Sequence, residues 1–324
     1  MKHVEHLDIA DFADWSARFV KPFHGQYFAM YSSVFGGIVT DPRLMLVPVD
    51  DHMVHRGDGV FESFKFVNRK LYNLKAHLDR LVSSARGIGL ALPCTMDELS
   101  GIVIQTARTA GKRDGLVRVL LSRGPGSLGV SPYDCPEPAL YVIVSEFKKP
   151  FMEVHPGGAR VMSSSIPVKP SPFAQMKTVN YLFNVLMKKE SVDEGVDFVV
   201  SFDENGHLAE GPTENAGIVT PDRILKVPRL ERILAGTTML RTLELAQALV
   251  KEGVLARTEN TDIPPSEVSG AAEMLIFGTT PDVSAAVEFD GKPIGNGKPG
   301  PVFARLSRML QDDITNNSAM QTPI

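Results

Sequence analysis

The sequence predicts an α+β fold of two domains with a cleft between them, on three observations. The chain has 324 residues, about the length of two domains of typical size. Strand-like and helix-like apolar patterns follow one another without the regular alternation of a doubly wound sheet. Segment 148–158, which reads KKPFMEVHPGG, has the proline and glycine of a linker. We therefore predict an N-terminal extension at 1–35, a small domain at 36–147, and a large domain at 159–324.

The small domain is predicted to combine strands with a helix. Residues 59–66 carry phenylalanines at period two, which is typical of a strand, and 68–70 would close a hairpin. Residues 74–87 carry leucine and valine on one helical face and end in glycine. Two strands rich in valine, leucine and isoleucine follow at 116–122 and 140–147.

The large domain is predicted to contain three helices and a hairpin. The helices are expected at 181–194, from Thr238 to Lys251, and from Pro301 onward, and the hairpin at 203–206. In front of the small domain, residues 1–35 are predicted to form a packing arm, because four aromatic side chains have roughly helical spacing (Trp15, Phe19, Phe23 and Tyr27).

Composition restricts the partners and the compartment. A net charge of −4 and a pI of about 6.1 argue against nucleic acid, which requires clustered lysine and arginine. Only two cysteines, Cys94 and Cys135, are present, as expected in a reducing compartment. The N-terminus lacks the apolar segment of a secretion signal, and no apolar run approaches the length of a membrane helix. We predict a cytoplasmic protein that binds neither nucleic acid nor membrane.

Lys177, in the stretch QMKTVNYL, is the candidate catalytic amine. A lysine that condenses with an aldehyde must be partly desolvated or near positive charge, so that its neutral amine is available. Met176 precedes it and an apolar helix follows. A lone lysine at a helix start is more often simply exposed. The prediction therefore depends on the motifs that come after it.

A carboxylate for a pyridine nitrogen is available in the stretch LAEGPTEN. Glu210 suits this task, because a carboxylate keeps such a nitrogen protonated and lets the ring accept electrons. Glu214 is the rival, and the residues alone leave the choice nearly even. Asn215 can fix the geometry through its amide.

Two Gly-Thr-Thr turns and one arginine are candidates for a phosphate site. The first turn precedes an apolar helix, so its amides and the helix dipole would face an anion, although the same residues also make a simple N-cap. The second follows an apolar strand, and the arginine would add a bidentate clamp. These residues are Gly236, Thr237 and Thr238, then Gly278, Thr279 and Thr280, and Arg80. A lysine, an acid and two hydroxyl-rich turns together predict a pyridoxal 5'-phosphate site.

Two further patterns are rejected as sites. The run GPGSLG at 124–129 matches the dinucleotide motif, but the residues after it open no helix. His52 and His55 are possible metal ligands, yet no further histidine or cysteine stands at ligand spacing. No metal site is predicted.

From about Val34 onward the chain resembles the class IV, or fold type IV, pyridoxal phosphate aminotransferases. This family includes branched-chain aminotransferases, D-amino acid transaminases and aminodeoxychorismate lyases. The run HRGDGVFE at 55–62 resembles its first motif block and HLDRL at 77–81 its second. The stretch from FGTT at 277–280 to residue 302 resembles its last block.

The resemblance implies a role for each motif residue. Lys177 would form the Schiff base and shuttle the proton, Glu210 would pair with the ring nitrogen, and Tyr181 would bond the phenolic oxygen. The phosphate would be held by Arg80, Thr237, Thr238 and Thr279. The resemblance also implies that two domains enclose the cofactor, that the large domain binds it, and that the protein is a homodimer.

The implied reaction moves an amino group between an amino acid and a 2-oxo acid. The run from Val34 to Gly57 looks most like plant-type D-amino acid transaminases, so a D-amino acid such as D-alanine is favoured. The carboxylate clamp of bacillar relatives is missing at 126–130, so we predict that Arg56 holds the substrate carboxylate, with Phe61 as a second contact. Pairing of Arg56 with Asp58 or Glu62 is equally open. Alternatives are a branched-chain L-amino acid aminotransferase, an aminodeoxychorismate lyase releasing pyruvate, and a catalytically idle binding protein.

Overall fold

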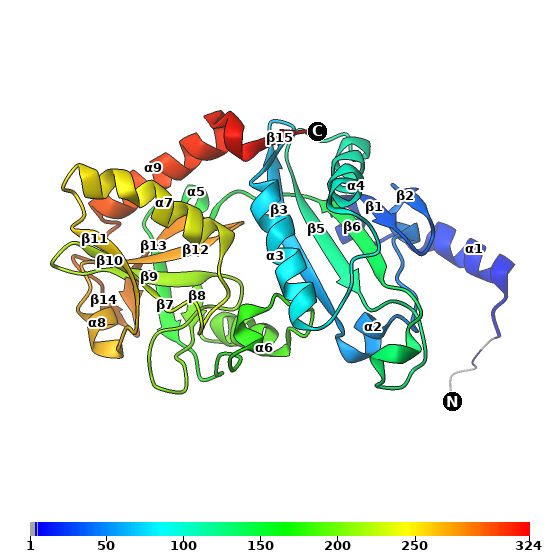
Figure 1. Ribbon diagram of the computed structural model, residues 1–324, viewed down its shortest axis with the longest axis horizontal. Coiled ribbons are helices and arrows are strands. Elements are labelled where there is room, and N and C mark those ends of the chain that lie inside the picture. The colour runs from blue at the N-terminus through cyan, green and yellow to red at the C-terminus, as the bar shows by residue number, and fades with distance from the viewer. Residues whose placement is uncertain (1–3, 5) are drawn as a thin grey trace.

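The computed structural model describes Val4 and residues 6–324, which form two β-sheets with helices packed on them (Figure 1). The first sheet is antiparallel throughout, with the strand order β15-β4-β3-β5-β6-β1-β2. Its strands are β1 (Tyr27–Ser32), β2 (Gly37–Val39), β3 (Gly59–Val67), β4 (Lys70–Tyr72), β5 (Gly115–Ser122), β6 (Ala139–Ser145) and β15 (Gln321–Pro323).

The second sheet is mixed, with the order β11-β10-β9-β12-β13-β7-β8. Its central strands are antiparallel, whereas β11 pairs parallel with β10, and β7 pairs parallel with both β13 and β8. The strands are β7 (Ala159–Ser163), β8 (Phe198–Val200), β9 (Asn215–Val219), β10 (Ile224–Pro228), β11 (Arg257–Thr261), β12 (Glu273–Gly278), β13 (Asp282–Phe289) and the short β14 (Lys292–Pro293). The predicted α+β class is confirmed.

Helices pack on each sheet, and Figure 1 shows α3 and α4 beside the first sheet and α7 and α9 beside the second. The α-helices are α1 (Ile9–Arg18), α2 (His52–Arg56), α3 (Leu74–Gly87), α4 (Met96–Thr109), α5 (Phe151–Val154), α6 (Leu182–Asp193), α7 (Thr237–Lys251), α8 (Pro265–Ser269) and α9 (Pro301–Asn316). Short 3₁₀ helices are η1 (Pro22–Gln26), η2 (Pro42–Leu44), η3 (Pro132–Asp134), η4 (Phe173–Gln175) and η5 (Ser318–Met320). Among the described helices, none is both long and apolar enough to cross a bilayer.

Sequence periodicity accounts for the elements of the first half. In α3, Leu74, Leu78 and Leu81 recur at helical spacing and are buried against the sheet, as the sequence predicted. A capping box begins α4: Glu98 N–H donates to the Thr95 hydroxyl, and Thr95 N–H donates to the Glu98 carboxylate. The apolar faces of both helices are buried in the same core, and the capping box fixes the start of α4.

The aromatic residues near the N-terminus do not form one continuous helix. Helix α1 ends at Arg18, and Tyr27, which shares the helical spacing, begins β1. That strand pairs with β6 inside the first sheet, with Ala29 and Met30 buried. Aromatic residues that recur every four positions are typical of a helix, but backbone pairing and burial place Tyr27 in a sheet instead. The limits of the extension and of the two domains stay a prediction.

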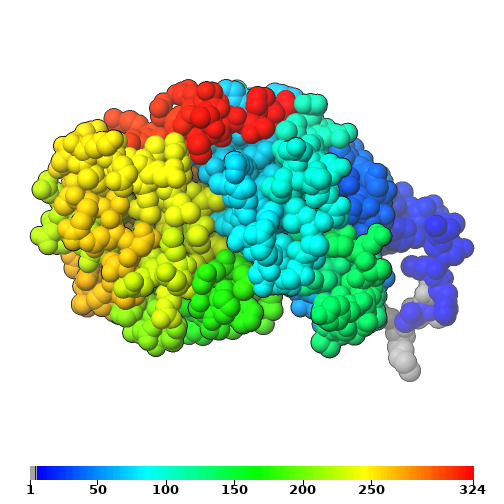
Figure 2. Space-filling model, in the orientation of Figure 1, coloured from blue at the N-terminus to red at the C-terminus, as the bar shows by residue number. Residues whose placement is uncertain are grey.

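The C-terminal residues join the two halves of the molecule. After α9, β15 pairs antiparallel with β4 at the edge of the first sheet. Tyr72 of β4 donates its hydroxyl to Asp313 of α9 over 2.6 Å, and Arg241 of α7 donates to the same carboxylate over 2.9 Å. Figure 2 shows these C-terminal residues, in red, lying along the top of both halves. Contacts of α9 and β15 are therefore one of the connections that hold the two sheets relative to each other.

Candidate active site

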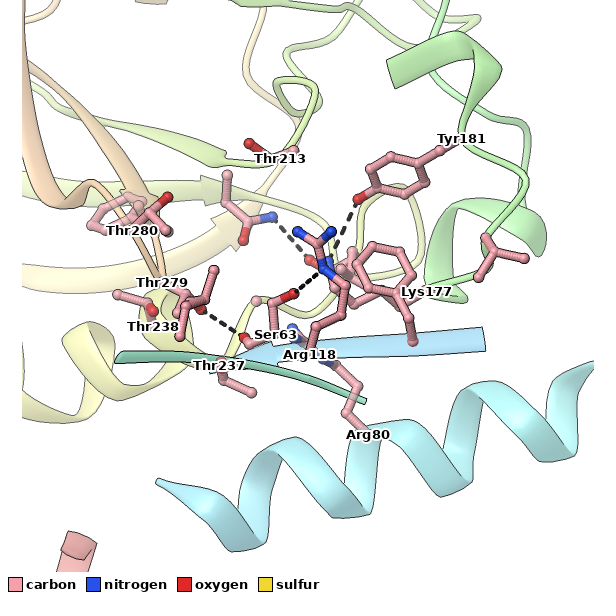
Figure 3. A pocket seen from close by; sticks show the side chains of 18 of the residues that line it. Ser63, Arg80, Arg118, Lys177, Tyr181, Thr213, Thr237, Thr238, Thr279 and Thr280 are labelled. Carbon is pink, nitrogen blue, oxygen red and sulfur yellow. Dashed lines mark hydrogen bonds between the residues drawn. The ribbon is translucent and has the colours of Figure 1, made fainter. Parts of the chain in front are cut away.

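A cavity of about 480 Å³ lies where the two halves meet, and its polar side chains point into it from both (Figure 3). The first half contributes Phe61, Ser63, Arg80, Leu116, Arg118 and Leu120, and the segment before α6 contributes Lys177, Val179 and Tyr181. The second half contributes Thr213, Asn215, Leu234, Gly236, Thr237, Thr238, Phe277, Gly278, Thr279 and Thr280. The structure thus brings together all the predicted site residues except Glu210, which stands just behind the wall, and Arg56.

The segment that carries Lys177 is attached to the first sheet. The carbonyl oxygen of Lys177 accepts a hydrogen bond from Phe61 N–H over 2.9 Å, and Val179 N–H donates to the Gly59 carbonyl over 2.9 Å. Lys177 N–H also donates to the Ser84 hydroxyl of α3 over 3.0 Å. A short antiparallel bridge therefore fixes the backbone of Lys177 against β3, so its side chain can be aimed only into the cavity.

The amine of Lys177 is desolvated and lies among aromatic rings. Its side chain is 9 % exposed, and Nζ lies 3.5 Å from the Tyr181 hydroxyl and 4.6 Å from the centre of the Phe61 ring. Burial, followed by the charge of Arg80, lowers the pKa of Lys177 to about 8. At pH 7 roughly a tenth of this amine is therefore neutral, far more than for an exposed lysine, and the neutral form is the one that attacks an aldehyde.

Glu210 and Asn215 form a hydrogen-bonded pair at the wall of the cavity. Asn215 Nδ2 donates to Glu210 Oε2 over 3.3 Å, and Leu234 N–H donates to the same oxygen over 3.1 Å. Burial raises the pKa of Glu210 to about 7, against the opposing effect of the Leu234 amide. Gly236 is required beside them, because a Cβ there would collide with Asn215 Oδ1.

Glu214, the rival carboxylate, has a different environment. Its oxygens accept hydrogen bonds from the Thr213 hydroxyl and from Thr213 N–H, at 3.1 Å for the amide. Burial raises its pKa, with the Thr213 contacts opposing. Both acids have partners that line the cavity. Among the described residues, the carboxylate of Glu214 is bound only by its neighbour Thr213. Glu210 is instead oriented by Asn215 and Leu234, 5 and 24 residues further along the chain, so the geometry favours Glu210 as the carboxylate of the site.

The two Gly-Thr-Thr turns approach the cavity from the second half. Thr237 and Thr238 are the first residues of α7, so the N-terminus of this fifteen-residue helix lies at the cavity. The second turn follows β12, and its Thr279 hydroxyl donates to the Ser63 carbonyl over 3.3 Å. Both turns therefore lie at the same cavity, where their backbone amides can donate to an anion, while the Thr279 hydroxyl is bound to Ser63.

Arg80 faces the same region, but its guanidinium is already held by the protein. Nε and Nη2 donate to the two carboxylate oxygens of Glu62 over 2.7 and 2.8 Å, and Nη1 donates to the Ala235 carbonyl over 2.9 Å. His77 Nδ1 lies 2.7 Å from the same carboxylate, and His77 Nε2 lies 3.2 Å from the Thr237 hydroxyl. A chain of polar contacts thus joins Arg80 to the start of α7.

Glu62 and His77 are buried supports that sequence reasoning did not single out. Burial alone would raise the pKa of Glu62, but Arg80 and His77 hold it at about 2, so the carboxylate is ionised. Burial lowers the pKa of His77. Both residues stand in the first two motif blocks of the sequence, so their spacing from Arg80 was a signal that could have identified them.

Arg118 of β5 is a third residue that the sequence analysis missed. Its side chain lines the cavity, Nε lies 3.3 Å from the Ser63 hydroxyl, and it forms no ion pair with any carboxylate among the described residues. The signal was one charged residue within the apolar strand 115–122, on the opposite face from Val117 and Val119.

Arg56, by contrast, lies outside the cavity. Its guanidinium donates to the carbonyl oxygens of Gly129, His55 and Leu128 over 3.0, 2.8 and 2.6 Å. The predicted alternative partner Asp58 is instead bound by Arg123 and His52. Arg56 therefore supports the loop around Leu128 in this structure, whereas Phe61, grouped with it in the sequence, does line the cavity.

Comparison with known proteins shows which family shares this arrangement. The model of the amino-transferase class IV family matches residues 59–289. The chain belongs to the class IV aminotransferases. This family membership confirms the resemblance seen in the sequence and makes the protein a pyridoxal 5'-phosphate-dependent aminotransferase.

Several class IV relatives and structures are similar over most of the chain. A D-amino-acid transaminase, chloroplastic, of Arabidopsis thaliana is 41% identical over 290 residues, which are 89% of this chain and 77% of that protein. A putative branched-chain-amino-acid aminotransferase of Methanocaldococcus jannaschii is 30% identical, covering 85% and 94%. The crystal structure of the T.th. branched-chain amino acid aminotransferase with pyridoxamine 5'-phosphate superposes with a TM-score of 0.84 at 25% identity, covering 92% and 99%.

The chemistry of the cavity fits the class IV cofactor. An aldehyde requires a desolvated amine, a phosphate requires amides and hydroxyls near positive charge, and a pyridine nitrogen requires a carboxylate. The cavity presents Lys177 for the first, the two Thr turns for the second, and Glu210 with Asn215 for the third.

We expect the amine of Lys177 to titrate far below exposed lysines. In the cofactor-free protein its labelling by an amine-selective reagent should increase with pH around a midpoint near pH 8, since the pKa of Lys177 is lowered to about 8. Exposed lysines titrate near about 10.4. Arg80→Met should raise the midpoint, because it removes a positive charge and leaves Glu62 without its arginine partner. Peptide mass spectrometry over a pH series gives both values, and a Lys177 midpoint equal to that of exposed lysines would contradict this electrostatic account.

Proposed function

We propose that Lys177 is the amine that bonds to the cofactor aldehyde and moves the proton at the substrate α-carbon. The observation that carries this proposal is its position: a buried lysine, attached to β3 by backbone hydrogen bonds, whose amine faces the cavity. When bound, the cofactor supplies a protonated ring that accepts electrons from the substrate α-carbon. Holding the amine close to that carbon is the contribution of this chain.

The other cavity residues take the remaining contacts in this proposal. Glu210, oriented by Asn215, pairs with the ring nitrogen, and the Tyr181 hydroxyl, 3.5 Å from Lys177 Nζ, donates to the cofactor's phenolic oxygen. The phosphate binds at the two Gly-Thr-Thr turns with Arg80 behind them. These residues are Gly236, Thr237 and Thr238, Gly278, Thr279 and Thr280. A paired cofactor cation would return Glu210 to its ionised form, since burial is what raises its pKa.

We infer that the amino donor is a D-amino acid such as D-alanine. The Arabidopsis relative, named as a D-amino-acid transaminase, is 41% identical to this chain, against 30% and 27% for the branched-chain relatives of Methanocaldococcus jannaschii and Pseudomonas aeruginosa. A branched-chain L-amino acid is the second candidate, because solved structures with that name share the fold over nearly their whole length.

Single amino donors test the proposed reaction. Loaded protein mixed with D-alanine should lose the visible absorbance of the Lys177-bound cofactor, while L-leucine should leave it unchanged. Lys177→Ala should retain the fold, checked by circular dichroism, and should show neither the visible band nor turnover. Loss of the band with L-leucine alone would assign a branched-chain enzyme instead. Turnover by Lys177→Ala would contradict the proposal that Lys177 is the catalytic amine.

Arg118 is the proposed contact for the substrate carboxylate. It is a cavity arginine without an ion-pair partner among the described residues, whereas Arg56 donates to three backbone carbonyls. Arg118→Met should raise KM for the amino donor by about tenfold to a hundredfold, because a hydrogen bond to a charged group contributes about 1.5–3 kcal/mol.

Arg56→Met is the matched control for Arg118, with the same substitution at an arginine outside the cavity. Its donor KM should equal that of the wild type. A raised KM for Arg56→Met together with an unchanged KM for Arg118→Met would assign the carboxylate to Arg56, as the sequence alone had predicted.

We propose that the protein is a homodimer that associates through α6. This helix follows the Lys177 segment, and its apolar side chains Leu182, Val185 and Leu186 are 63, 57 and 40 % exposed. Contiguous exposed apolar side chains of this kind mark association surfaces. The wild type should sediment as twice its mass of 35.4 kDa. Val185→Glu should sediment as a monomer, whereas Val154→Glu, at an exposed position of α5, should not. A monomeric wild type would contradict the proposal.

A further inference from the structure

β3 directs a row of alternate side chains toward the second half of the molecule. Phe61, Ser63 and Lys65 lie two residues apart and so share one face of the strand. Phe61 and Ser63 line the cavity. Lys65, the next in the row, instead forms an ion pair with Asp282 of the second sheet. The two residues are 4 % and 3 % exposed, so this pair is shielded from water.

Asp282 belongs to the structure that closes the second Thr turn. It follows Pro281 directly and is the first residue of β13, with a left-handed φ of 56°. One carboxylate oxygen binds Lys65, and the other accepts a hydrogen bond from Gln311 of α9 over 2.8 Å. Both oxygens therefore have partners, and the end of the turn is attached to β3 and to α9 together.

The other end of the turn is attached to the same strand. The Thr279 hydroxyl donates to the Ser63 carbonyl over 3.3 Å, and Figure 3 shows both residues at the cavity. The Lys65 ammonium also lies 5.2 Å from the centre of the Phe147 ring, in the segment that leaves the first sheet. Residues 279–282 are thus held across the seam by two contacts to alternate positions of β3.

This double attachment has a physical reason in the proposed function. The anion site is divided, since Arg80 belongs to the first half and both Thr turns to the second. A phosphate can be bound by both halves only when the gap between them is fixed to within about half an ångström. A buried ion pair is a strong constraint on that gap, because separating it leaves an uncompensated charge away from water.

We propose that Lys65 and Asp282 are positioning residues that fix the Thr279–Thr280 turn against β3 and thereby set the affinity of the cavity for the cofactor phosphate. The proposal rests on the proposed function in one respect, the binding of phosphate at the Thr turns. Neither side chain touches the cofactor site itself. Substitution of either residue is therefore expected to weaken the binding of the phosphate group and not that of the rest of the cofactor.

The ratio of two affinities isolates that effect. Pyridoxal 5'-phosphate and pyridoxal differ only in the phosphate. The affinity ratio, defined as the dissociation constant of pyridoxal divided by that of pyridoxal 5'-phosphate and measured by absorbance titration, therefore reports the phosphate contacts. Lys65→Met should weaken binding of the phosphorylated form by at least about tenfold, or about 1.4 kcal/mol, and that of pyridoxal by less than about threefold. If Lys65→Met folds poorly, Asp282→Asn is the second variant, because asparagine tolerates the left-handed conformation. It should also weaken the binding of pyridoxal 5'-phosphate more than that of pyridoxal.

Two matched variants separate positioning from general stability. Lys226→Met makes the same substitution in a second lysine–carboxylate pair, with Glu267 at 2.7 Å, away from the cavity, and should leave the ratio unchanged. In Lys65→Met/Asp282→Asn no unpaired charge remains, so the thermal midpoint should return toward the wild-type value. The affinity ratio should stay low in this double variant, because the turn is still not attached to β3 through residue 65.

The outcomes distinguish this inference from the proposed function. A wild type that binds pyridoxal 5'-phosphate no more tightly than pyridoxal contradicts phosphate binding at the Thr turns. A normal wild-type ratio with equal losses of both affinities in Lys65→Met, or with no loss of either, overturns the positioning role. Recovery of the ratio in the double variant would also overturn it, since the loss would then come from the unpaired charge.

Discussion

The anion side of the cavity depends on one buried charge, the carboxylate of Glu62. It has no exposed surface, so its ionised form must be compensated within the protein. Arg80 and His77 provide this compensation, and a pKa of about 2 keeps Glu62 charged at neutral pH. In doing so the carboxylate holds both side chains against β3, and through His77 it reaches the Thr237 hydroxyl of α7. One ionised group therefore aligns the arginine with the helix that faces the same anion.

The opposite side of the cavity shows a different use of burial. Lys177 and Glu210 are both desolvated, and their pKa values of about 8 and about 7 approach each other from opposite directions. Without the cofactor at physiological pH, Lys177 is still mostly protonated but has a far larger neutral fraction than an exposed lysine, and Glu210 titrates close to this pH. The neutral fraction of Lys177 can react as a free amine, and a cation bound beside Glu210 would favour the ionised form of this carboxylate. In the proposed function, the cavity binds a ligand that is anionic at its phosphate and cationic at its ring.

Much of this could be predicted from the sequence, because the signals were local. The limits of α3 follow from its leucine spacing and its terminal glycine, and Lys177 and the two Thr turns stand in recognisable runs. The environment of Arg56 could not be predicted, since its partners include the carbonyl oxygens of Leu128 and Gly129, more than seventy residues away. Arg118 was missed for a related reason. The face of a strand that meets the cavity is decided by tertiary packing, which no local pattern records.

The position of β15 has a consequence for the order in which the protein can fold. The first sheet has β6 as the last of its strands in the N-terminal half, ending at Ser145, whereas its edge strand β15 begins at Gln321. During synthesis from the N-terminus, the edge of β4 stays unpaired until the whole second sheet and α9 have emerged. An open edge of this kind is a template for pairing with other chains. We therefore expect the first half to expose an unpaired strand edge during synthesis until the C-terminal residues have emerged.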